Sequence, residues 1–359
     1  MVRTFEFPGF VDVHVHFRDP GVPAAETTAS GAAAARRGGF AAVVTMPNTV
    51  PAGDNAEWIR RQRDDSLPVK IISSACITRG RLGAEVADLE ILAEAGAAFF
   101  TDDGSYVTDD AVMEKAMVRA ADLGMAICDH ALVPSPGVMR DCALARRLSL
   151  PVVPASAEAD AIARDISLCR VTGCRLHVQH ISAAAGVELV RAARKEGLPV
   201  TAEATPHHLL LCCDDLAEDD ANFKMAPPLG NREDRAELRR AVKDGVLMFA
   251  TDHAPHPASA KSCGFLTGAN GIVGLETAIP ITWAVMVEEE GMDVQDWARA
   301  WWDMPRWIVA GSDAISGRTV VRVDEEHRRK VDISAFASLS RNCPYNGMEF
   351  SCWPEEVVR

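Results

Sequence analysis

Eight short apolar runs recur along the chain, and segments with helical periodicity separate them. The runs cover residues 10–16, 41–48, 69–77, 97–103, 126–131, 175–182, 200–208 and 246–256. The helical patterns cover residues 26–37, 84–95, 109–123, 157–171, 187–196 and 233–243. Each helical pattern ends within two residues of a glycine, which suits the left-handed conformation that closes many helices. These glycines are Gly38, Gly96, Gly124, Gly173, Gly197 and Gly245.

The order of these elements predicts the fold class. Strands that are apolar along their whole length and joined by helices favour a parallel sheet covered by helices. Eight such units predict an α/β protein with a (β/α)8, TIM-like barrel. A doubly wound open sheet also alternates strands and helices, but its first turn usually carries a glycine-rich phosphate loop. No such loop follows residues 10–16, so we favour the barrel.

The last part of the chain departs from this alternation. Residues 278–290 and 294–303 have helical patterns, and the second contains three tryptophans whose spacing suits the core or an oligomer contact. They are Trp297, Trp301 and Trp302. We predict a barrel domain over residues 1–310 and a C-terminal extension, residues 311–359, that packs on the barrel.

Composition narrows the possible locations and partners. The chain has 359 residues and 48% hydrophobic content, so it can bury a large core, and its net charge of −14 argues against a nucleic-acid partner. The N-terminus lacks the layout of a signal peptide, and no apolar run is long enough to span a bilayer. The ten cysteines form no C-x-x-C pair, which suits reduced core residues. We expect a cytoplasmic protein without a membrane partner.

Polar side chains gather where the apolar runs end. A barrel carries its chemistry at the carboxyl ends of its strands, and nine of the ten histidines fall at these ends. The groups there are His14, His16 and Arg18, Asn48, Asp102 and Asp103, Asp129 and His130, His177 and His180, His207 and His208, and Asp252, His253 and His256. Histidines scattered through a core would not be distributed in this way.

His14 and His16 give the most direct indication of a metal site. In an extended strand, side chains at positions i and i+2 point to the same face, so both imidazoles can reach one ion. Taken alone, His130 or His180 is more often a hydrogen-bonded core residue, and Asp103 would serve as a helix cap. Taken together, imidazoles and carboxylates from several strands form the open kind of site in which Zn²⁺ is catalytic.

Six blocks of sequence, in order, resemble the signature motifs of dihydroorotases, which belong to the amidohydrolase superfamily. The blocks are HVHFRDPG from His14, MPNT from Met46, FTDDG from Phe100, HVQHIS from His177, VTAEATPHH from Val200 and ATDHAPH from Ala250, with a weaker similarity from Ser340. The resemblance implies a (β/α)8 barrel that interconverts N-carbamoyl-L-aspartate and L-dihydroorotate, with water, in pyrimidine (UMP) synthesis. Because the chain enters the barrel within ten residues, we expect the N-terminal strands of the accessory β-sandwich, and most of that sandwich, to be missing.

The resemblance also implies a set of metal ligands. It makes His14, His16 and Asp252 ligands of one zinc, and His130 and His180 ligands of a second. Asp103 is the implied bridging residue, because the fourth apolar run ends in aspartates and has no lysine to carry a bridging carboxylate. A plain carboxylate is shorter than a lysine carbamate, so we expect one or two zinc ions, the second bound more weakly. Asp252 is the predicted catalytic base.

Five further residues are predicted to bind the substrate. Arg18, Asn48 and His256 resemble the residues that hold the α-carboxylate in this family, and a guanidinium suits that task as a charged planar fork. A surface ion pair with Asp19 is the alternative for Arg18. Asn270 and Gly271 end a polar loop that falls where the family contacts its substrate. Four other histidines at the strand ends are not predicted to belong to the site: His177, His207, His208 and His253. Glu203 and Glu26 are candidates for hydrogen bonds that support the site residues.

Departures from the family pattern keep two alternatives open. Ala226 and Gly230 stand where many dihydroorotases have asparagine and arginine, Asn270 stands where an aromatic residue is usual, and Leu132 lies near the usual position of an acid. One alternative is therefore a related cyclic amidohydrolase acting on hydantoin- or allantoin-like rings. The other is a non-catalytic partner of aspartate carbamoyltransferase, which would be expected to have lost metal ligands. The family resemblance also suggests a homo-oligomer and a complex with aspartate carbamoyltransferase.

Overall fold

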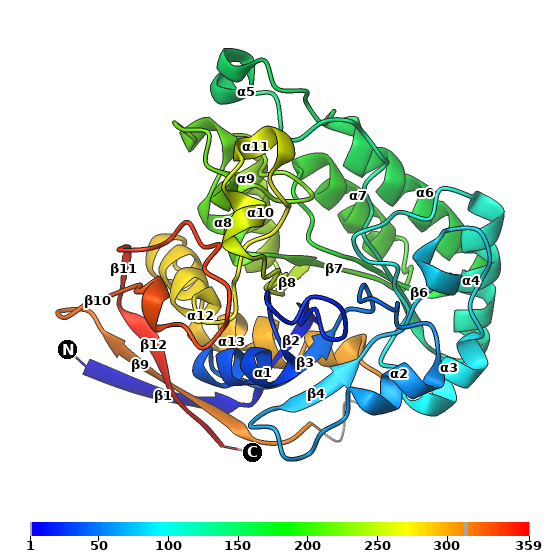
Figure 1. The fold of residues 1–359 in the computed structure, drawn as a ribbon, viewed down its shortest axis with the longest axis horizontal. Helices are drawn as coiled ribbons and strands as arrows, with labels where there is room; N and C mark the ends of the chain where they lie inside the picture. Colours follow the sequence, from blue (N-terminus) through cyan, green and yellow to red (C-terminus); the bar gives the residue numbers. More distant parts are fainter. Residues whose placement is uncertain (1, 312–314, 359) are drawn as a thin grey trace.

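Seven parallel strands form two sheets at the centre of the molecule. The structure is a computed structural model and describes residues 2–311 and 315–358. One sheet has the order β2-β3-β4 and the other the order β5-β6-β7-β8. Their bounds are β2 Phe10–Val15, β3 Phe40–Thr45, β4 Lys70–Ser73, β5 Ala126–Asp129, β6 Arg175–Val178, β7 Val200–Ala204 and β8 Leu247–Phe249. Helices lie outside the strands, as α4, α6 and α7 do on the right of Figure 1. The α/β class with parallel strands is confirmed.

Short segments connect the edges of the two sheets. Phe100 forms parallel bridges with Ala75, just after β4, and with Ile127 in β5. On the other side, Val15 in β2 forms a parallel bridge with His253, after β8. The predicted strand over residues 97–103 is therefore shortened: residues 98–101 exchange backbone hydrogen bonds with Ser73 and Ala75 on one side, and Phe100 does so with Ala126 and Cys128 on the other. Two residues past Phe100 the chain turns, because the Asp102 side chain accepts hydrogen bonds from the backbone N–H groups of Ile77 and Thr78.

The predicted helices form with small changes at their ends. They are α1 Thr28–Arg37, α3 Leu89–Ala95, α4 Asp110–Asp122, α6 Ser156–Thr172, α7 Ala184–Lys195 and α9 Arg232–Lys243. The periodicity did not predict three further short helices, α2 Ala56–Arg61, α5 Ala143–Leu148 and α8 Pro206–Leu210. The helix expected from residue 84 begins only at Leu89, because Val86 pairs with Thr78 in a bridge and the Asp88 side chain caps the helix. Gly96 and Gly173 close their helices in the left-handed conformation as expected, whereas after α1 it is Gly39, not Gly38, that has a positive φ of 93°.

The segment after Thr277 forms the predicted helices. They are α12 Ala278–Thr282, a π-helical continuation over Trp283–Glu289, and α13 Val294–Trp302. Trp297 and Trp301 are fully buried, and both indole N–H groups donate to the hydroxyl of Thr282 at 3.2 Å. A core role for these two tryptophans is confirmed.

Both ends of the chain meet in a separate antiparallel sheet. Its strands are β1 Val2–Pro8, β9 Arg318–Asp324 and β12 Cys352–Val358, in the order β1-β9-β12. It lies at the lower left of Figure 1, beside both termini. The expectation that no strand precedes the barrel is therefore wrong. The signal was the alternation of Phe5 and Phe7 with polar neighbours, since Phe7 stacks on Phe10 and reaches Trp297.

Short elements complete the surface of the fold. They are β10 Arg329–Lys330, β11 Glu349–Phe350, α10 Ala258–Lys261, α11 Gly264–Thr267 and 3-10 turns at Arg79–Arg81, Cys213–Asp215, Ala221–Phe223, Pro305–Trp307 and Ile333–Ala335. In the described parts of the chain, no helix has both the length and the apolar character that a bilayer crossing needs. All ten cysteines are free, and only Cys263 is exposed.

Candidate active site

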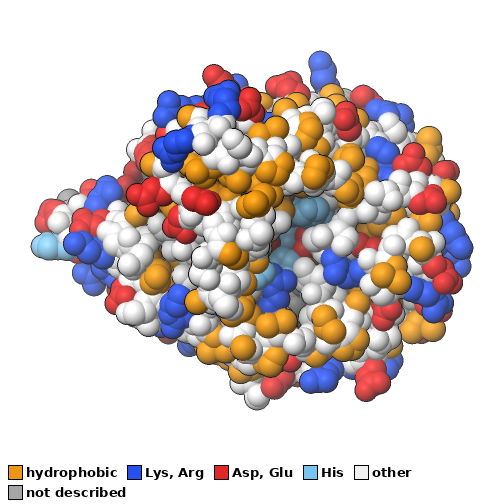
Figure 2. Space-filling view, turned by 45° about the horizontal axis from the view of Figure 1, so that its top comes forward, with side chains coloured by type: hydrophobic (Ala, Val, Ile, Leu, Met, Phe, Trp, Pro, Cys, Tyr) orange, Lys and Arg blue, Asp and Glu red, His pale blue; other side chains and the backbone are white. Residues whose placement is uncertain are grey.

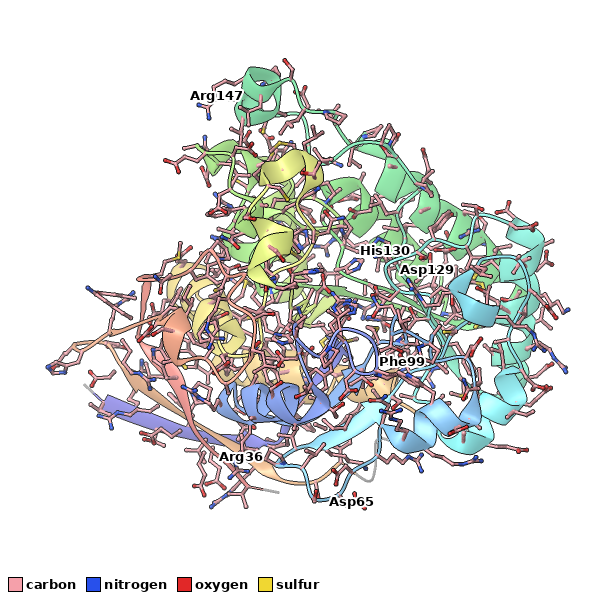
Figure 3. The ribbon with its side chains drawn as sticks, viewed as in Figure 1. Arg36, Asp65, Phe99, Asp129, His130 and Arg147 are labelled. Atoms are coloured by element: carbon pink, nitrogen blue, oxygen red, sulfur yellow. The ribbon has the colours of Figure 1, made fainter. Side chains whose placement is uncertain are left out.

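The six predicted metal ligands lie together at the carboxyl ends of the central strands. They are His14, His16, Asp103, His130, His180 and Asp252, and all are buried. His14 belongs to β2, and His130 directly follows β5 near the middle of the molecule, next to Asp129 (Figure 3). Histidine side chains are visible at the bottom of a hollow in the face shown in Figure 2. Residues separated by more than two hundred positions thus form one cluster.

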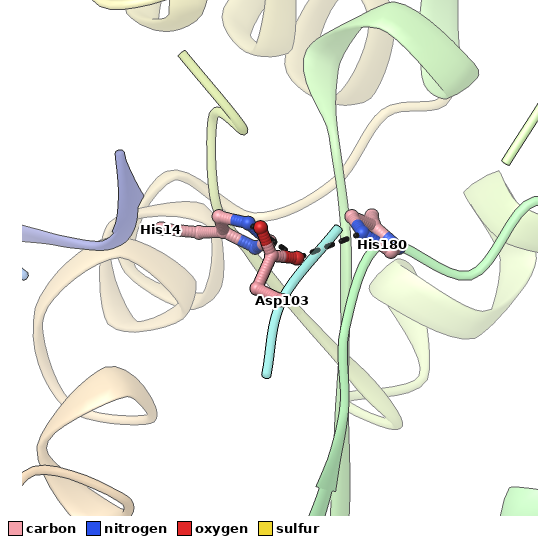
Figure 4. A group of neighbouring side chains, drawn as sticks. All are labelled: His14, Asp103 and His180. Atoms are coloured by element: carbon pink, nitrogen blue, oxygen red, sulfur yellow. Dashed lines mark ion pairs between the residues drawn. The ribbon is translucent and has the colours of Figure 1, made fainter. Parts of the chain in front are cut away.

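Asp103 lies between the two halves of this cluster. Its Oδ1 atom is 3.2 Å from Nε2 of His14 and 3.5 Å from Nε2 of His180, as the dashed lines in Figure 4 mark. The same oxygen is 3.6 Å from Nδ1 of His130, while Oδ2 is 3.2 Å from Nε2 of His16. One carboxylate therefore faces four imidazoles, which is the arrangement of a bridging ligand.

Asp252 faces the histidines of β2. Its Oδ1 atom lies 3.0 Å from Nε2 of His16 and 3.5 Å from Nε2 of His14. On the other side of Asp103, Nδ1 of His130 is 2.9 Å from Nε2 of His180. Two groups have ligand atoms within 4.8 Å of one another, namely His14, His16 and Asp252, and His14, Asp103 and His180.

Hydrogen bonds on the far side of the rings orient the first two histidines. Nδ1 of His14 is 2.6 Å from Oε1 of Glu203, and Nδ1 of His16 is 2.8 Å from Oδ1 of Asn48. Both partners are acceptors, so each Nδ1 carries a proton and each Nε2 faces the cluster. This tautomer is the one that ligation through Nε2 requires.

The charges of the cluster favour a cation at its centre. Burial disfavours a charged imidazole, yet the carboxylates of Asp103 and Glu203 raise the pKa of His14 well above its ordinary value. Burial opposes ionisation of Asp252 too, but the hydrogen bond from His16 and the nearby charge of His14 lower the pKa of Asp252 to about 2. Burial, together with Arg18, lowers the pKa of His16, so that imidazole is neutral and can act as a ligand.

Unpaired atoms support the same conclusion. Nε2 of His14 and Oδ1 of Asp103 are buried side-chain atoms without a hydrogen-bond partner, and both point into the cluster. Buried polar atoms are normally paired, so such orphans call for an ion or a water. Imidazole nitrogens and carboxylate oxygens are suitable ligands for zinc. The residues present therefore fit the metal that the family resemblance implies.

The backbone is strained at the site. Five non-glycine residues in the described ranges have a positive φ, and three of them are site residues. They are Arg18 at 56°, His180 at 34° and Asp252 at 47°. Left-handed conformations of this kind are unfavourable for residues with a Cβ and persist where surrounding contacts impose them, often at functional sites.

The predicted substrate-binding residues line a cavity of about 230 Å³ beside the cluster. They are Arg18, Asn48, His256, Asn270 and Gly271. Arg18 does not pair with Asp19, which instead accepts hydrogen bonds from the backbone N–H and the hydroxyl of Thr28. Nε of Arg18 donates to the carbonyl of Pro255 at 3.3 Å. In the described part of the chain, no carboxylate lies within 4.0 Å of the guanidinium nitrogens of Arg18. A partly buried cation is thus available to an acidic ligand.

The four histidines left out of the site support the residues around it. Nε2 of His177 is 2.9 Å from Oε2 of Glu203, the residue that also contacts His14. His207 pairs with the Tyr345 hydroxyl at 2.6 Å. Nε2 of His208 donates to the carbonyl of Pro227, and Nε2 of His253 lies 3.3 Å from Glu26. The supporting contacts expected of Glu203 and Glu26 are therefore present.

Sequence reasoning missed two residues that hold site loops. Arg81 donates to the carbonyl of Asp103 at 2.5 Å, so it fixes the turn that carries the Asp103 carboxylate. The Asn342 side chain donates to the carbonyls of Ala254 and Gly271 and accepts the backbone N–H of His256. Asn342 lies within the weaker similarity from Ser340, which was the available signal, whereas no motif marked Arg81.

The departures from the family pattern fall in two places. Ala226 and Asn270 line the cavity. Gly230 does not line the cavity. A Cβ at Gly230 would meet the carbonyl of Ser182 at 2.6 Å, so a larger side chain would not fit there without rearrangement. The acid next to Gly230, Asp234, instead lies 3.6 Å from the buried Arg140.

Comparison with known proteins decides the family. The profile described as Dihydro-orotase-like matches residues 5–185. The chain is 41% identical to the dihydroorotase of Geobacillus thermodenitrificans over 362 residues, covering 97% of this chain and 84% of the relative. It is 42% identical to the dihydroorotase of Bacillus caldolyticus over 358 residues, with the same shares. The chain belongs to the dihydroorotase family.

Solved structures share the fold of this dihydroorotase family member. L-Hydantoinase (dihydropyrimidinase) from Arthrobacter aurescens superposes with a TM-score of 0.85 at 24% identity, covering 98% of this chain and 83% of that one. Dihydroorotase from Saccharomyces cerevisiae, solved in complex with 5-fluoroorotic acid, gives a TM-score of 0.77 at 17% identity, covering 99% and 100%. At these identities the similarity establishes the fold alone.

Proposed function

We propose that this member of the dihydroorotase family is a zinc-dependent dihydroorotase, which cyclises N-carbamoyl-L-aspartate to L-dihydroorotate and water, and reverses that reaction, in pyrimidine (UMP) biosynthesis. One observation supports this above others. A cluster of imidazoles and carboxylates suited to a divalent cation opens into the same cavity as Arg18, which has no carboxylate partner among residues 2–311 and 315–358. The dihydroorotase relatives at about 41% identity support the same reaction.

The proposed zinc ligands are His14, His16, Asp103, His130, His180 and Asp252. When bound, zinc would polarise the amide carbonyl and lower the pKa of a water molecule to about 7. Glu203 and Asn48 keep His14 and His16 in the tautomer that leaves Nε2 free to bind it. Because His14 and Asp103 belong to both halves of the cluster, we propose one or two ions that share these residues.

Asp252 is the proposed proton carrier. In the ring-opening direction, water adds to the amide carbon and the bond from that carbon to the ring nitrogen breaks. The Asp252 carboxylate takes the proton of the attacking water and delivers it to the leaving nitrogen. A pKa of about 2 keeps Asp252 ionised at neutral pH, so it is ready to accept the proton. The ring-closing direction uses the same groups in reverse order.

Arg18, Asn48 and His256 are the proposed carboxylate-binding residues. The Arg18 guanidinium lies 3.5 Å from Nε2 of His256, and burial together with Arg18 lowers the pKa of His256 to about 3, so the imidazole is neutral. Because Nε2 of the neutral His256 donates to the carbonyl of Asn270, we infer that His256 acts by placing Arg18 and Asn270 at the anion rather than by its own charge. Asn48 uses its amide oxygen on His16, which leaves its amide N–H groups for the substrate.

The finer description of the architecture is also a proposal. We infer that the two parallel sheets together form a closed (β/α)8 barrel, supported by the bridges at Phe100 and His253 and by the fold of the structural relatives. A cytoplasmic location remains a prediction from the sequence composition. A homo-oligomer and a complex with aspartate carbamoyltransferase remain predictions from the family resemblance. Analytical ultracentrifugation of the protein, alone and with aspartate carbamoyltransferase, would test the last two.

Turnover and metal analysis test the proposed function. Purified protein should contain zinc and interconvert L-dihydroorotate and N-carbamoyl-L-aspartate, and a chelator should abolish turnover until zinc is restored. Zinc-loaded protein without measurable turnover would contradict the assignment and favour a non-catalytic partner. The six proposed ligands are all present in the chain and lie buried close together, which argues against that alternative.

A second candidate is a cyclic amidohydrolase that acts on hydantoin-like rings with an apolar substituent. A side compartment of about 230 Å³ adjoins the substrate cavity and shares Gly104, His130, Ala226 and Asn270 with it. Its remaining wall includes the apolar side chains of Leu132, Val133, Val138, Val153 and Met225, together with Tyr106. L-Dihydroorotate has no apolar group to occupy such a space.

Substituted hydantoins distinguish the two candidates. If the second is correct, kcat/KM should be higher for 5-benzylhydantoin than for L-dihydroorotate. Val153→Phe should then lower kcat/KM for the benzyl substrate, whereas Val152→Phe, at the exposed neighbouring position, should not. Turnover of L-dihydroorotate alone would leave dihydroorotase as the function.

A further inference from the structure

We propose that Lys224 and Lys261 are positioning residues that hold segment 268–271 against the substrate cavity, so that Asn270 and Gly271 are fixed before the substrate binds. What the cavity binds rests on the proposed function. The contacts between the lysines and the segment are independent of it.

The carbonyl groups of four consecutive residues are held by side chains. Nζ of Lys224 donates to the carbonyl of Gly268 at 2.7 Å. Nζ of Lys261 donates to the carbonyls of Ala269 and Gly271 at 2.7 and 2.8 Å. Nε2 of His256 donates to the carbonyl of Asn270 at 2.7 Å, and Nδ2 of Asn342 to that of Gly271 at 3.0 Å. A segment of loop is thus anchored at every carbonyl.

The two lysines are unusually buried for their residue type. Each is 6% exposed, and in the described ranges all hydrogen bonds of their ammonium groups go to backbone carbonyls. Burial, and then the neighbouring Lys224 ammonium, lower the pKa of Lys261 to about 7. A buried cation without a paired carboxylate is unfavourable for folding, so stability alone does not explain two of them side by side.

The segment they hold forms a wall of the substrate cavity. Asn270 and Gly271 line that cavity together with His256. Gly271 has a φ of 128° and approaches closely, because a Cβ there would lie 2.5 Å from that of Ala254. A displaced segment would therefore change the shape of the cavity. Preorganisation of such a wall lowers the entropy that the substrate must overcome on binding.

Replacement of Lys261 by methionine tests the proposal, because methionine keeps the aliphatic stem and removes the donor. For Lys261→Met we expect KM for L-dihydroorotate to rise about tenfold or more, since two charge-assisted hydrogen bonds are lost. We expect kcat to stay within about twofold, because the residue does not touch the reacting atoms. The zinc content and the melting temperature should not fall, since an apolar side chain replaces a buried charge.

Hydrogen–deuterium exchange supplies a readout that does not depend on activity. Exchange of peptides covering residues 266–272 should speed up in Lys261→Met, and in Lys224→Met to a smaller extent. Lys243→Met is the matched control, because Lys243 also donates to a backbone carbonyl, that of Glu290, but is exposed and lies on α9. It should leave both KM and exchange unchanged.

The outcomes separate this proposal from the proposed function. Unchanged exchange in Lys261→Met would overturn the positioning role, whatever the activity. Faster exchange without a rise in KM would overturn the link to substrate binding. If the unaltered protein does not turn over L-dihydroorotate, the proposed function fails, and the exchange experiment still decides whether the lysines hold the segment.

Discussion

At the level of single residues, Asp252 combines three features of a catalytic group. Its carboxylate lies 3.0 Å from Nε2 of His16, its pKa is lowered to about 2, and its backbone has the unfavourable positive φ of 47°. A side chain needed only for packing would require none of these. The surrounding contacts hold a carboxylate at this place in its ionised form.

Asp252→Asn should separate catalysis from folding. Asparagine keeps the shape of the side chain but cannot carry a proton, so we expect kcat to fall by about a thousandfold or more. Circular dichroism and the melting temperature should show a folded protein. Asp141→Asn, at an exposed aspartate that pairs with Arg146, should keep full turnover. Substantial activity in Asp252→Asn would remove Asp252 as the proton carrier.

Glu203 acts through the histidine that it orients. Glu203→Gln keeps the size of the side chain but weakens its acceptors toward Nδ1 of His14 and Nε2 of His177. Loss of such a supporting carboxylate typically lowers metal affinity about 10- to 100-fold, and we expect a change of that size in the affinity for zinc. Competition with a chromophoric chelator would measure it. Glu196→Gln, at an exposed glutamate that pairs with Arg170, is the control and should bind zinc normally.

The buried Lys261 predicts a pH dependence of stability. Its pKa is about 7 in the folded protein, against the ordinary value of 10.5 in the unfolded chain. Between these values the unfolded chain holds a proton that the folded protein lacks, so the free energy of unfolding rises with pH, by at most about 1.4 kcal/mol per pH unit. The cost of burying Lys261 is therefore absent above pH 10.5, grows as the pH falls toward 7, and is fully present below pH 7. Urea unfolding at several pH values should show a smaller slope for Lys261→Met than for the unaltered protein.

The chemistry of the site was more readily predicted from sequence than the residues that hold it in place. The spacing of His14 and His16 and the motif around Asp252 point to ligands directly, because metal ligands follow strand ends. Lys261 and Asn342 act on backbone carbonyls of a distant segment, and no spacing or composition reveals such contacts. Only the structure shows the conformation of segment 268–271.

At the level of elements, periodicity located most strands and helices but not where pairing stops. Residues 97–103 are apolar enough for a strand, yet backbone pairing stops at Thr101. Asp102 then holds the following turn against the segment that contains Ile77 and Thr78. The strand Val2–Pro8 was overlooked because its partner, β9, lies about three hundred positions away. Local pattern cannot identify a partner at that distance.

Phe7 tests how strongly the terminal sheet is attached. Its ring is 3% exposed and lies 5.6 Å from Phe10 and 5.9 Å from Trp297, so β1 contributes directly to the core. Phe7→Ala should lower the free energy of unfolding by about 3 kcal/mol, as expected for removal of a buried ring. Urea denaturation followed by tryptophan fluorescence would measure the change. Phe336→Ala, at a half-buried phenylalanine, should cost clearly less, and an equal loss would show that Phe7 is not part of the core.

At the level of the whole molecule, the site spans the boundary between the two parallel sheets. His14 and His16 come from the end of β2, in one sheet, and His130 and His180 follow β5 and β6, in the other. Asp103 and Asp252 come from the segments whose single bridged residues, Phe100 and His253, link the two sheets. An ion bound by this set would therefore join both sheets where their backbone pairing is thinnest.

Zinc removal should consequently affect the stability of the whole fold as well as turnover. Free zinc at a thousand times its Kd stabilises a folded protein by about 4 kcal/mol. With an unfolding entropy of about 2.1 cal/mol/K per residue, this corresponds to a melting temperature about 5 °C lower after chelation for a chain of this length. Calorimetry would measure the shift, and hydrogen–deuterium exchange should speed up at both junctions, residues 97–103 and 250–256.

His14→Ala should show no shift with chelator, because it lacks the ligand common to both groups. Faster exchange at only one junction would mean that the ion does not connect the two sheets.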